Sequence, residues 1–318
     1  MNKDLTKFLA SLVKLAALSC VSILVMLILG IFVIGCQYED GYNASLIDKI
    51  ARLKSINEPK IILVGNSNLS FGMNSAMVEE AINMPVVNLG LHGGLGNVFH
   101  ENMAKLNINS GDVVIICHSN FSDDDRIIDA LLAWITLEYH RDLWDIVRGK
   151  DYPSLLQRYP IYWLKALKEC ILRTVQADTS YTRHSFNKYG DVMKKSENGR
   201  VPHEKMFKPG RIERPKINDT CINRLNLLNK FVRQREAVML VAGYPIGYGE
   251  YTPPAEQYKE FQRELASRLD CEVISDYTDY FIPYEYFYDT ILHLDEEGTR
   301  IRTTQLIKDI KNWQARHN

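Results

Sequence analysis

Residues 60–67 read KIILVGNS, an apolar run that stops abruptly at glycine, asparagine and serine. A short run of this kind, rich in β-branched residues, is typical of a strand buried on both faces of a sheet. Two further runs have the same character: residues 85–89 read PVVNL and residues 112–117 read DVVIIC. Glycine or polar residues follow each run, so we expect turns at the carboxyl ends of three buried strands.

Helices are expected between and after these strands. The apolar spacing predicts two later strands, over 237–242 and 272–275. The same spacing predicts helices over about 75–82, 98–107, 222–234, 256–269 and 296–316. Strands that alternate with helices form a mostly parallel sheet with helices on both faces. The expected fold class is therefore α/β, a three-layer α/β/α sandwich.

The alternation of strands and helices breaks between about residues 125 and 225. This stretch holds aromatic-rich segments of helical character and then a polar tract from 178 to 217. We expect a largely helical insertion over the edge of the sheet where the strands end, within a domain that spans residues 59–318. Residues 37–58 are expected to form a stalk in front of that domain, with a short helix over 44–56.

The N-terminal region predicts a membrane anchor. Leu15–Cys36 carries no charge, and a helix of that length measures roughly 33 Å, close to the thickness of a bilayer core. Charged residues flank it, three lysines before and two carboxylates after: Lys3, Lys7, Lys14, Glu39 and Asp40. By the positive-inside rule, residues 1–36 form a cytoplasmic tip and one transmembrane helix, and the domain lies outside the cytoplasm in a single-pass membrane protein.

Other interpretations of this segment stay open. A cleaved signal peptide has a shorter apolar core, of roughly 7–15 residues. A lipoprotein signal would place the lipid on Cys36, because Val33–Cys36 resembles a lipobox. Both alternatives keep the domain outside the cytoplasm. A buried core helix is disfavoured, because the segment is apolar on all faces and not along one stripe.

Composition narrows the classes of partner. The formal net charge of the 318 residues is −1, which disfavours nucleic acid, because phosphate backbones need clustered lysine and arginine. The six cysteines contain no CxxC pair, so we expect no metal site. The glycines at 90–96 lack the spacing of a dinucleotide fingerprint, and no cofactor is expected. Cys170, Cys221 and Cys271 could form a disulfide in an oxidising compartment, and the pairing stays open.

Four polar segments carry residues suited to acyl transfer. Three follow the first three strands: GNSN at 65–68, NLGLHGG at 88–94 and HSN at 118–120. The fourth, DTILHL at 289–294, precedes the last helix. Ligands of open α/β sheets bind beyond the carboxyl ends of the strands, where the first three segments are expected to meet.

These four segments, in this order, resemble the conserved blocks of the SGNH (GDSL-like) hydrolases, which have a flavodoxin-like sandwich. The resemblance covers most of residues 60–120 and 237–316 and implies that Ser67 is the nucleophile. It also implies that Asp289 and His293 complete the triad, and that Gly93 and Asn120 donate to the oxyanion. It is closest to the membrane-anchored branch that is associated with acyl modification of extracellular polymers, whose members often work with a multi-spanning membrane protein that delivers the acyl group.

The chemistry requires the same parts without reference to any family. A serine hydroxyl attacks well only if a base takes its proton, and His293 can do so near neutral pH. Asp289 would orient the imidazole and stabilise its charged form. Amide donors near Ser67 would bind the oxygen that becomes negative in the tetrahedral intermediate. His92 and His118 also follow strands, and we expect them to line the pocket and not to act as the base.

The chain departs from the SGNH pattern in four places. Asn66 replaces the usual aspartate, Ser119 replaces a glycine, and Asp289 and His293 are one residue further apart than in the common D-x-x-H. Asp295 stands where an asparagine often follows the histidine. We predict a serine esterase or O-acyltransferase, acetyl transfer included, that acts on an extracytoplasmic polysaccharide or cell-envelope polymer. The departures leave open a non-catalytic binding or assembly protein with this fold. The anchor leaves open a lipase that acts on membrane lipids.

Two further segments allow a structural or a functional interpretation. Residues 277–288, YTDYFIPYEYFY, could stack on sugar rings beside the catalytic pair or pack in the core. Residues 186–191 of the insertion could form a plain surface loop or a lid that binds the acceptor.

Overall fold

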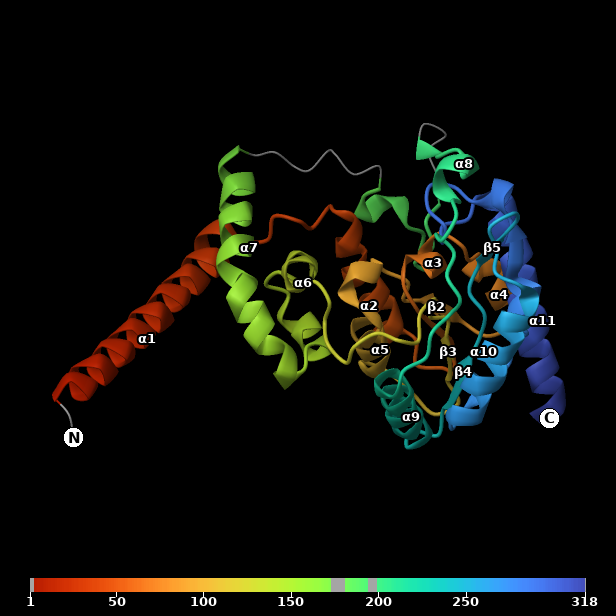
Figure 1. Ribbon diagram of the computed structural model, residues 1–318, viewed down its shortest axis with the longest axis horizontal. Helices are drawn as coiled ribbons and strands as arrows, with labels where there is room; N and C mark the ends of the chain where they lie inside the picture. The colour runs from red at the N-terminus through yellow and green to blue at the C-terminus, as the bar shows by residue number, and fades with distance from the viewer. Residues whose placement is uncertain (1–2, 173–180, 194–198, 318) are drawn as a thin grey trace.

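The computed structural model describes residues 3–172, 181–193 and 199–317 (Figure 1). Its centre is a five-stranded sheet in the order β2-β1-β3-β4-β6, in which every neighbouring pair is parallel. The strands are β1 (Ile61–Val64), β2 (Val86–Asn88), β3 (Val113–Ile116), β4 (Val238–Val241) and β6 (Glu272–Val273). A separate pair is formed by β5 (Ile246–Tyr248) and β7 (Phe281–Pro283). The predicted α/β class with a parallel sheet is therefore confirmed.

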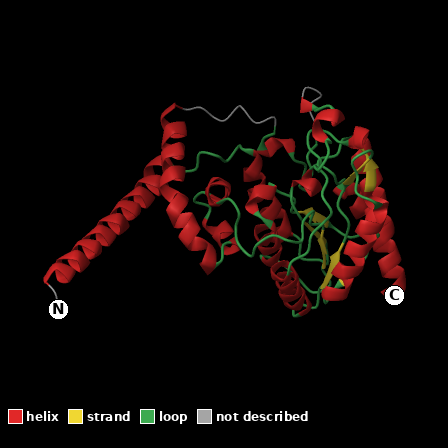
Figure 2. Ribbon diagram, viewed as in Figure 1, coloured by secondary structure: helices red, strands yellow, loops and turns green. Residues whose placement is uncertain are grey.

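Helices cover both faces of the sheet. Successive residues of a strand point to opposite sides, so each strand contributes side chains to two hydrophobic cores. In β1, Ile62 and Val64 belong to one hydrophobic core and Ile61 and Leu63 to another. The first core contains residues of α2 (Ser45–Ser55), α5 (Asn97–Lys105), α9 (Asp219–Arg233) and α10 (Ala255–Arg268). The second contains residues of α4 (Ser75–Ile82) and α11 (Glu296–His317). These are the three layers expected from the sequence, and Figure 2 shows the strands between the helices.

The strand order places the functional edge. From β1 the chain moves outward to β2, and from there it crosses to the other side of β1 to form β3. The switch in direction leaves a crevice beyond the carboxyl ends of β1 and β3, where ligands of doubly wound folds bind. The turn that begins at Gly65 and the turn that begins at Cys117 both open at this crevice.

The helix expected to form a stalk is part of the domain. Leu46, Ile50 and Leu53 of α2 are at most 1% exposed. Arg52 Nε donates to the carbonyl of Val86, the first residue of β2, at 2.9 Å. These contacts make residues 45–55 a layer of the sandwich, which corrects the stalk predicted over residues 37–58.

The insertion is largely helical where the structure describes it. It contains α6 (Ala130–Leu137), α7 (Tyr152–Leu172) and the short α8 (His203–Met206). Figure 1 shows α6 and α7 between the sandwich and the N-terminal helix. The later part of the insertion, residues 181–193 and 199–217, crosses the sandwich mostly as loops and short 3₁₀ turns.

One long apolar helix precedes the domain. Helix α1 (Lys3–Leu29) continues without a break into a π-helical turn, η1 (Gly30–Ile34). Residues Asp4–Ile34 are long and apolar enough to cross a membrane, and only 11% of the most apolar window is buried. Figure 1 shows α1 projecting away from the rest of the molecule, with only its far end meeting α7.

Two open points of the sequence receive a structural answer. All six cysteines lie in the described residues, and none of them forms a disulfide.

Within residues 277–288, Tyr277, Tyr280 and Tyr288 are at most 2% exposed, and Tyr284 stacks on Phe207 with ring centroids 3.9 Å apart. Most of this aromatic segment therefore packs in the interior.

Candidate active site

Three predicted residues form a continuous chain of hydrogen bonds. His293 Nε2 lies 2.8 Å from Ser67 Oγ, and His293 Nδ1 lies 2.7 Å from Asp289 Oδ1. The Asp289 and His293 side chains are 22% and 14% exposed, so a substrate can reach the group while much of the surrounding water is excluded. Both distances are those of short, well-formed hydrogen bonds. The structure thus brings together a hydroxyl, an imidazole and a carboxylate in series, which is the geometry of a Ser-His-Asp triad.

Ser67 is held by the tight turn after β1. It is the first residue of the short helix α3 (Ser67–Ser70), and Asn66 caps that helix by accepting from Asn68 N at 2.9 Å. The turn passes close to β3, since a Cβ on Gly65 would lie 2.9 Å from the carbonyl oxygen of Cys117. Only glycine fits this close approach of two backbones. The local sequence Gly65-Asn66-Ser67 therefore sets the direction of the nucleophile.

A buried arginine from the last helix fixes the same turn. Arg302 of α11 is 1% exposed, and its guanidinium donates to Asn68 O at 2.6 Å and to Asn68 Oδ1 at 2.7 Å. It also donates to Gly72 O at 3.3 Å. Sequence reasoning missed Arg302, because its helical position gives no sign that it reaches across 234 residues.

The segment between Asp289 and His293 is a compact turn. Thr290 Oγ1 accepts from the backbone N–H of His293 at 3.1 Å, and the carbonyl of His293 accepts from Tyr288 N at 2.9 Å. Asp295 then accepts from Gly298 N at 2.9 Å in the first turn of α11. The longer spacing of Asp289 and His293 is therefore absorbed within the turn, and the carboxylate still reaches the imidazole.

An aromatic ring packs against the imidazole of His293. Phe71, just after α3, stacks on the imidazole of His293 with centroids 4.0 Å apart and planes 9° from parallel. Tyr42 and Tyr181 pack against other sides of the Phe71 ring. Phe71 is 3% exposed, so it restricts the imidazole to one plane. Sequence reasoning missed this residue, although its place four residues after the nucleophile was a local signal.

Gly93 lies beside the nucleophile turn, as predicted. It begins the 3₁₀ turn η3 (Gly93–Leu95), and a Cβ placed on it would lie 3.6 Å from Asn66 Cβ. His92 caps this turn by accepting from Gly94 N at 3.0 Å. Partial desolvation and then the neighbouring His293 lower the pKa of His92. His92 is thus close to the triad, but its Nδ1 is already used in holding the glycine turn.

Asn120 lies at the same crevice, on the β3 side. Its carbonyl accepts from Asn97 Nδ2 at 2.8 Å, and its Oδ1 accepts from Ser122 N at 2.9 Å and from Ser122 Oγ at 2.8 Å. These bonds use the oxygen of the amide and leave its NH₂ group to donate. The preceding residue, Ser119, bonds to Asn66 beside the nucleophile. The two predicted oxyanion donors therefore flank the Ser67 turn on opposite sides.

His118 does not line the pocket, contrary to the prediction. It is fully buried, and its Nε2 lies 3.0 Å from Glu101 Oε1 of α5. Arg224 of α9 donates to the same carboxylate at 2.8 Å and to Asp123 at 2.9 Å. The cluster binds one ring nitrogen of His118, while Nδ1 has no hydrogen-bond partner among the described residues. The buried side chain thus ties the loop that carries Asn120 to α5.

A pocket of about 360 Å³ opens beside the triad. Ile291 and Leu292, which lie between Asp289 and His293, form part of its wall, and Ser119 and Asn120 form another part. The insertion supplies the segment 211–216, which brings Arg211, Arg214 and Lys216 to the rim with Glu213 among them. Part of the insertion therefore lies over the carboxyl edge of the sheet, in the place predicted for it.

The loop of residues 181–193 is held by buried polar groups. Asp191 accepts from Ser75 N at 2.8 Å, from Ser75 Oγ at 2.6 Å and from Asn88 Nδ2 at 2.8 Å. The buried Lys49 of α2 donates to the carbonyls of Asn88 and Gly190 at 3.0 and 2.5 Å. Because Asn88 ends β2, these bonds fasten the loop directly to the sheet. Residues 186–191 are therefore fastened to α4 and β2 by buried hydrogen bonds.

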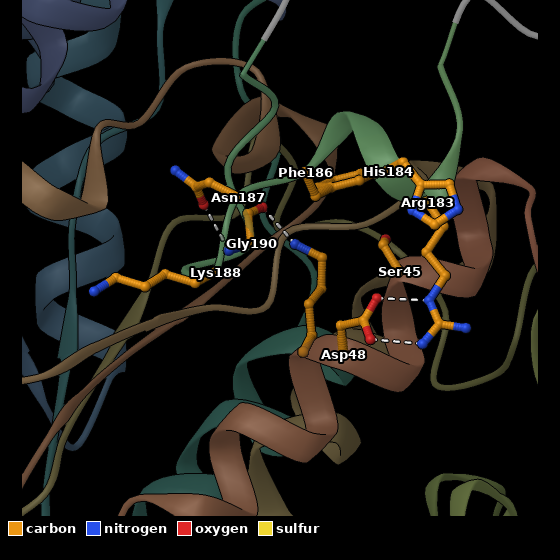
Figure 3. A pocket seen from close by; sticks show the side chains of 9 residues that line it. Ser45, Asp48, Arg183, His184, Phe186, Asn187, Lys188 and Gly190 are labelled. Carbon is orange, nitrogen blue, oxygen red and sulfur yellow. Dashed lines mark hydrogen bonds and ion pairs between the residues drawn. The ribbon is translucent and has the colours of Figure 1, made fainter.

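This loop also forms a second pocket, of about 270 Å³, against α2. Figure 3 shows the guanidinium of Arg183 beside the carboxylate of Asp48, with Nη2 and Oδ1 2.6 Å apart. None of the residues that line this pocket belongs to the triad, and one of its cations, Arg183, is paired with Asp48. It is therefore a feature of the way the loop packs on α2.

Among the described residues, one group has the side chains and spacing of a metal site. Cys36, Glu39 and His140 place their ligand atoms within 4.8 Å of one another. They lie where the N-terminal helix ends and include no residue of the triad.

No family model, curated protein or solved structure matches this chain.

Proposed function

We propose that this chain is a membrane-anchored serine esterase or O-acyltransferase that acts on an extracytoplasmic polysaccharide or other cell-envelope polymer. The observation that carries the proposal is the chain of hydrogen bonds from Asp289 through His293 to Ser67. The resemblance of the four sequence segments to SGNH hydrolases supports the same conclusion. An imidazole placed between a hydroxyl and a carboxylate has the geometry to take and return one proton.

The reaction runs through an acyl-enzyme. Ser67 Oγ attacks the ester carbonyl while its proton passes to His293 Nε2, and the developing oxyanion is bound by donors at Gly93 and Asn120. The bond to the leaving alcohol then breaks, and the alcohol takes the proton from His293. Water or a sugar hydroxyl attacks the Ser67 ester next and gives its proton to His293. The products are a free acid or a new ester, and Ser67 regains its proton.

The pocket beside the triad has a polar part and an apolar part. Arg211, Arg214, Lys216, Ser119 and Ser122 supply charged groups and hydroxyls, and the rest of the lining is apolar or aromatic: Ile212, Pro215, Tyr244, Pro245, Ile246, Tyr258, Ile291 and Leu292. A hydroxyl-rich polymer can form hydrogen bonds with the polar part, and the apolar part can hold the acyl group of an ester. This mixed lining is compatible with an acylated saccharide as the substrate.

The N-terminal helix supports a permanent anchor. Gly30 and Ile34, at its end, are buried against the insertion, and the backbone N–H groups of Gln37 and Tyr38 donate to Glu138 at 2.7 and 3.0 Å. Cleavage before Cys36 would remove Gly30 and Ile34, and with them their packing against the insertion. With lysines before the span and Glu39 and Asp40 after it, the positive-inside rule orients the domain away from the cytoplasm. A multi-spanning membrane protein that supplies acyl groups is the proposed partner.

A non-catalytic binding protein is the alternative, motivated by Asn66 and Ser119. A binding protein has no need for a serine, an imidazole and a carboxylate bonded in series. The continuous relay therefore supports the enzyme, and the altered positions adjust the turn around it.

The proposal is tested with the purified full-length chain in detergent. We expect it to hydrolyse a chromogenic acetyl ester and to be labelled at Ser67 by a fluorophosphonate. The variant Ser67→Ala should lose both, and Ser70→Ala, whose hydroxyl donates to Gly90 O at 2.6 Å away from the relay, should keep the label. A folded chain that neither turns over the ester nor takes the label would contradict the proposal.

A further inference from the structure

The amphipathic helix α7 of the insertion has two apolar faces and not one. Its buried face consists of Leu155, Tyr159, Tyr162 and Ala166. A second face, between about a quarter and a half of a turn away, carries Leu156, Leu164 and Ile171, which are 47%, 60% and 69% exposed. Partly buried Trp163 and Leu167 lie between the two faces. The spacing of seven and eight residues keeps the three exposed side chains within about 80° of one another around the helix.

The stripe is continuous, which separates it from ordinary exposed side chains. Single exposed leucines are common on soluble proteins, but an exposed apolar stripe along a whole helix marks a contact with a partner or a membrane. The remaining side of α7 carries Arg158, Lys165 and Lys168, all exposed, and the exposed apolar residues Ile161 and Leu172 lie among them. An apolar face with leucine and tryptophan, flanked by lysine and arginine, is the pattern of a helix that lies in a membrane interface.

The contact between α7 and the N-terminal helix determines how deep α7 lies relative to the membrane-spanning segment. Tyr159 Oη donates to the carbonyl of Met26 at 3.2 Å, and Ile23, Met26 and Leu27 are partly buried against the domain. Gly30 allows the close approach, because a Cβ there would lie 2.9 Å from Tyr159 Oη and closer still to Tyr139 Oη. The domain therefore packs against the last turns of the anchor helix, and not only against the residues that follow the helix.

These last turns belong to the part of the anchor that must span the bilayer. The uncharged stretch begins after Lys14, and about 20 residues are needed to cross the hydrocarbon core, so the span ends near Ile34. At 1.5 Å per residue, Met26 lies roughly 12 Å before that end, at the level of the acyl chains. The turn of α7 around Tyr159, which touches Met26, is therefore at the depth of the lipids.

We propose that α7 lies in the outer leaflet of the membrane, with the stripe Leu156–Leu164–Ile171 against acyl chains and Arg158, Lys165 and Lys168 near the lipid phosphates. The proposal rests on the anchor crossing the membrane, as in the proposed function. The anchor and α7 together hold the domain at two lines of contact, so the domain cannot swing freely about its tether. The crevice at Ser67 is then kept at a constant height and direction above the membrane surface.

The experiment places the photoreactive residue benzoylphenylalanine, one position at a time, in the full-length chain in cell membranes. Leu164 and Ile171 probe the stripe, Leu24 (56% exposed) probes the anchor, and Leu227 on α9 (68% exposed) is the matched control on the sandwich. After irradiation, mass spectrometry of the purified chain distinguishes phospholipid adducts from protein adducts. We expect lipid adducts at Leu164 and Ile171 to exceed those at Leu227 by about tenfold or more, since an interfacial face is buried among acyl chains.

Each other outcome overturns the inference. Lipid adducts at Leu24, with none at Leu164 and Ile171, would leave the anchor in place and remove α7 from the membrane. Protein adducts at Leu164 and Ile171 would identify the stripe as the docking face of a membrane partner. Absence of lipid adducts at all positions would contradict the anchor as well. Catalysis is not part of the readout, so an inactive chain would give the same adducts.

Discussion

Asn66 Nδ2 donates a hydrogen bond to Ser119 Oγ at 2.8 Å, so two of the positions at which the chain departs from the SGNH pattern are in direct contact. The other half of the Asn66 amide accepts from Asn68 N and from Asn68 Nδ2. Asn66 therefore joins the turn after β1 to the turn after β3, between the nucleophile and the Asn120 segment. The two departures form one compensating pair: the amide provides a donor, and the serine provides its acceptor.

The pair predicts unequal effects of substitution. Ser119→Ala leaves the Asn66 NH₂ group without its partner, and we expect a loss of about 1 kcal/mol of unfolding free energy with lower ester turnover. Asn66→Asp should be milder, because the Ser119 hydroxyl can rotate and donate to the new carboxylate. In the double variant that carboxylate lacks the donor, so the effects should not add. Urea denaturation and turnover measure both, and simple additivity would contradict the pairing.

Asp289 is expected to set the tautomer of the His293 imidazole. In Asp289→Asn the amide can present an N–H to His293 Nδ1, which forces the ring proton onto Nε2 and removes the base that faces Ser67. We expect ester turnover to fall by about 10⁴-fold with little change in thermal stability. Asp289→Ala should be no more severe, because it does not impose the wrong tautomer. Turnover of Asp289→Asn within tenfold of the natural chain would exclude this role.

Phe71 is expected to act through His293. The imidazole becomes a cation in the transition state, and a ring face in contact stabilises a cation. Phe71→Leu should therefore lower kcat about tenfold and leave KM nearly unchanged. Tyr42→Phe is the matched control, because Tyr42 packs on Phe71 and the change keeps the ring. If Phe71 acted only by packing, Phe71→Leu and Tyr42→Phe would change kcat to a similar extent, and each would also change thermal stability.

Arg302 is expected to stabilise the nucleophile turn. Arg302→Met removes the bonds to Asn68 O, Asn68 Oδ1 and Gly72 O and leaves three buried acceptors. We expect the unfolding free energy to fall by about 3 kcal/mol, with a loss of fluorophosphonate labelling at Ser67. Arg300→Met, an exposed residue of the same helix that pairs with Glu297, should change neither. Equal behaviour of the two variants in urea denaturation would refute the clamp.

Lys49 makes stability depend on pH. Burial lowers its pKa from 10.5 to about 7. Below pH 7 the amine is protonated in the folded and the unfolded chain, and the cost of burying the charge is complete. As the pH rises from 7 to 10.5, the folded chain releases its proton first, so this cost shrinks and stability increases. Lys49→Met should flatten the curve, although it also removes two hydrogen bonds and lowers stability at every pH.

The comparison needs a control on the same helix. Lys54 of α2 is exposed, and its side chain is 42% accessible, so Lys54→Met should keep the slope of the natural chain. The measurement is urea denaturation in detergent at several values between pH 7 and 10. An unchanged slope in Lys49→Met would show that the amine titrates normally in the folded chain.

The sequence predicted the sandwich because its signals are local. Each apolar run such as Ile61–Val64 is long enough for one buried strand, and each ends at residues that favour a turn. Since parallel strands end at one edge, the polar residues after them had to meet there. The resemblance of their segments to the SGNH blocks singled out Ser67, Asp289 and His293, and the structure places them within hydrogen-bonding distance.

The tertiary structure decided what depends on contacts between distant segments. Nothing in the spacing around His118 indicated that Glu101 and Arg224 would hold it beneath the sheet, and nothing in α11 indicated that Arg302 would reach the turn of Asn68. The same holds for α7, whose amphipathic pattern predicts a helix but not which of its apolar faces remains uncovered. A periodic sequence specifies that a face must be buried, whereas the partner that buries it is set by the packing of the whole chain.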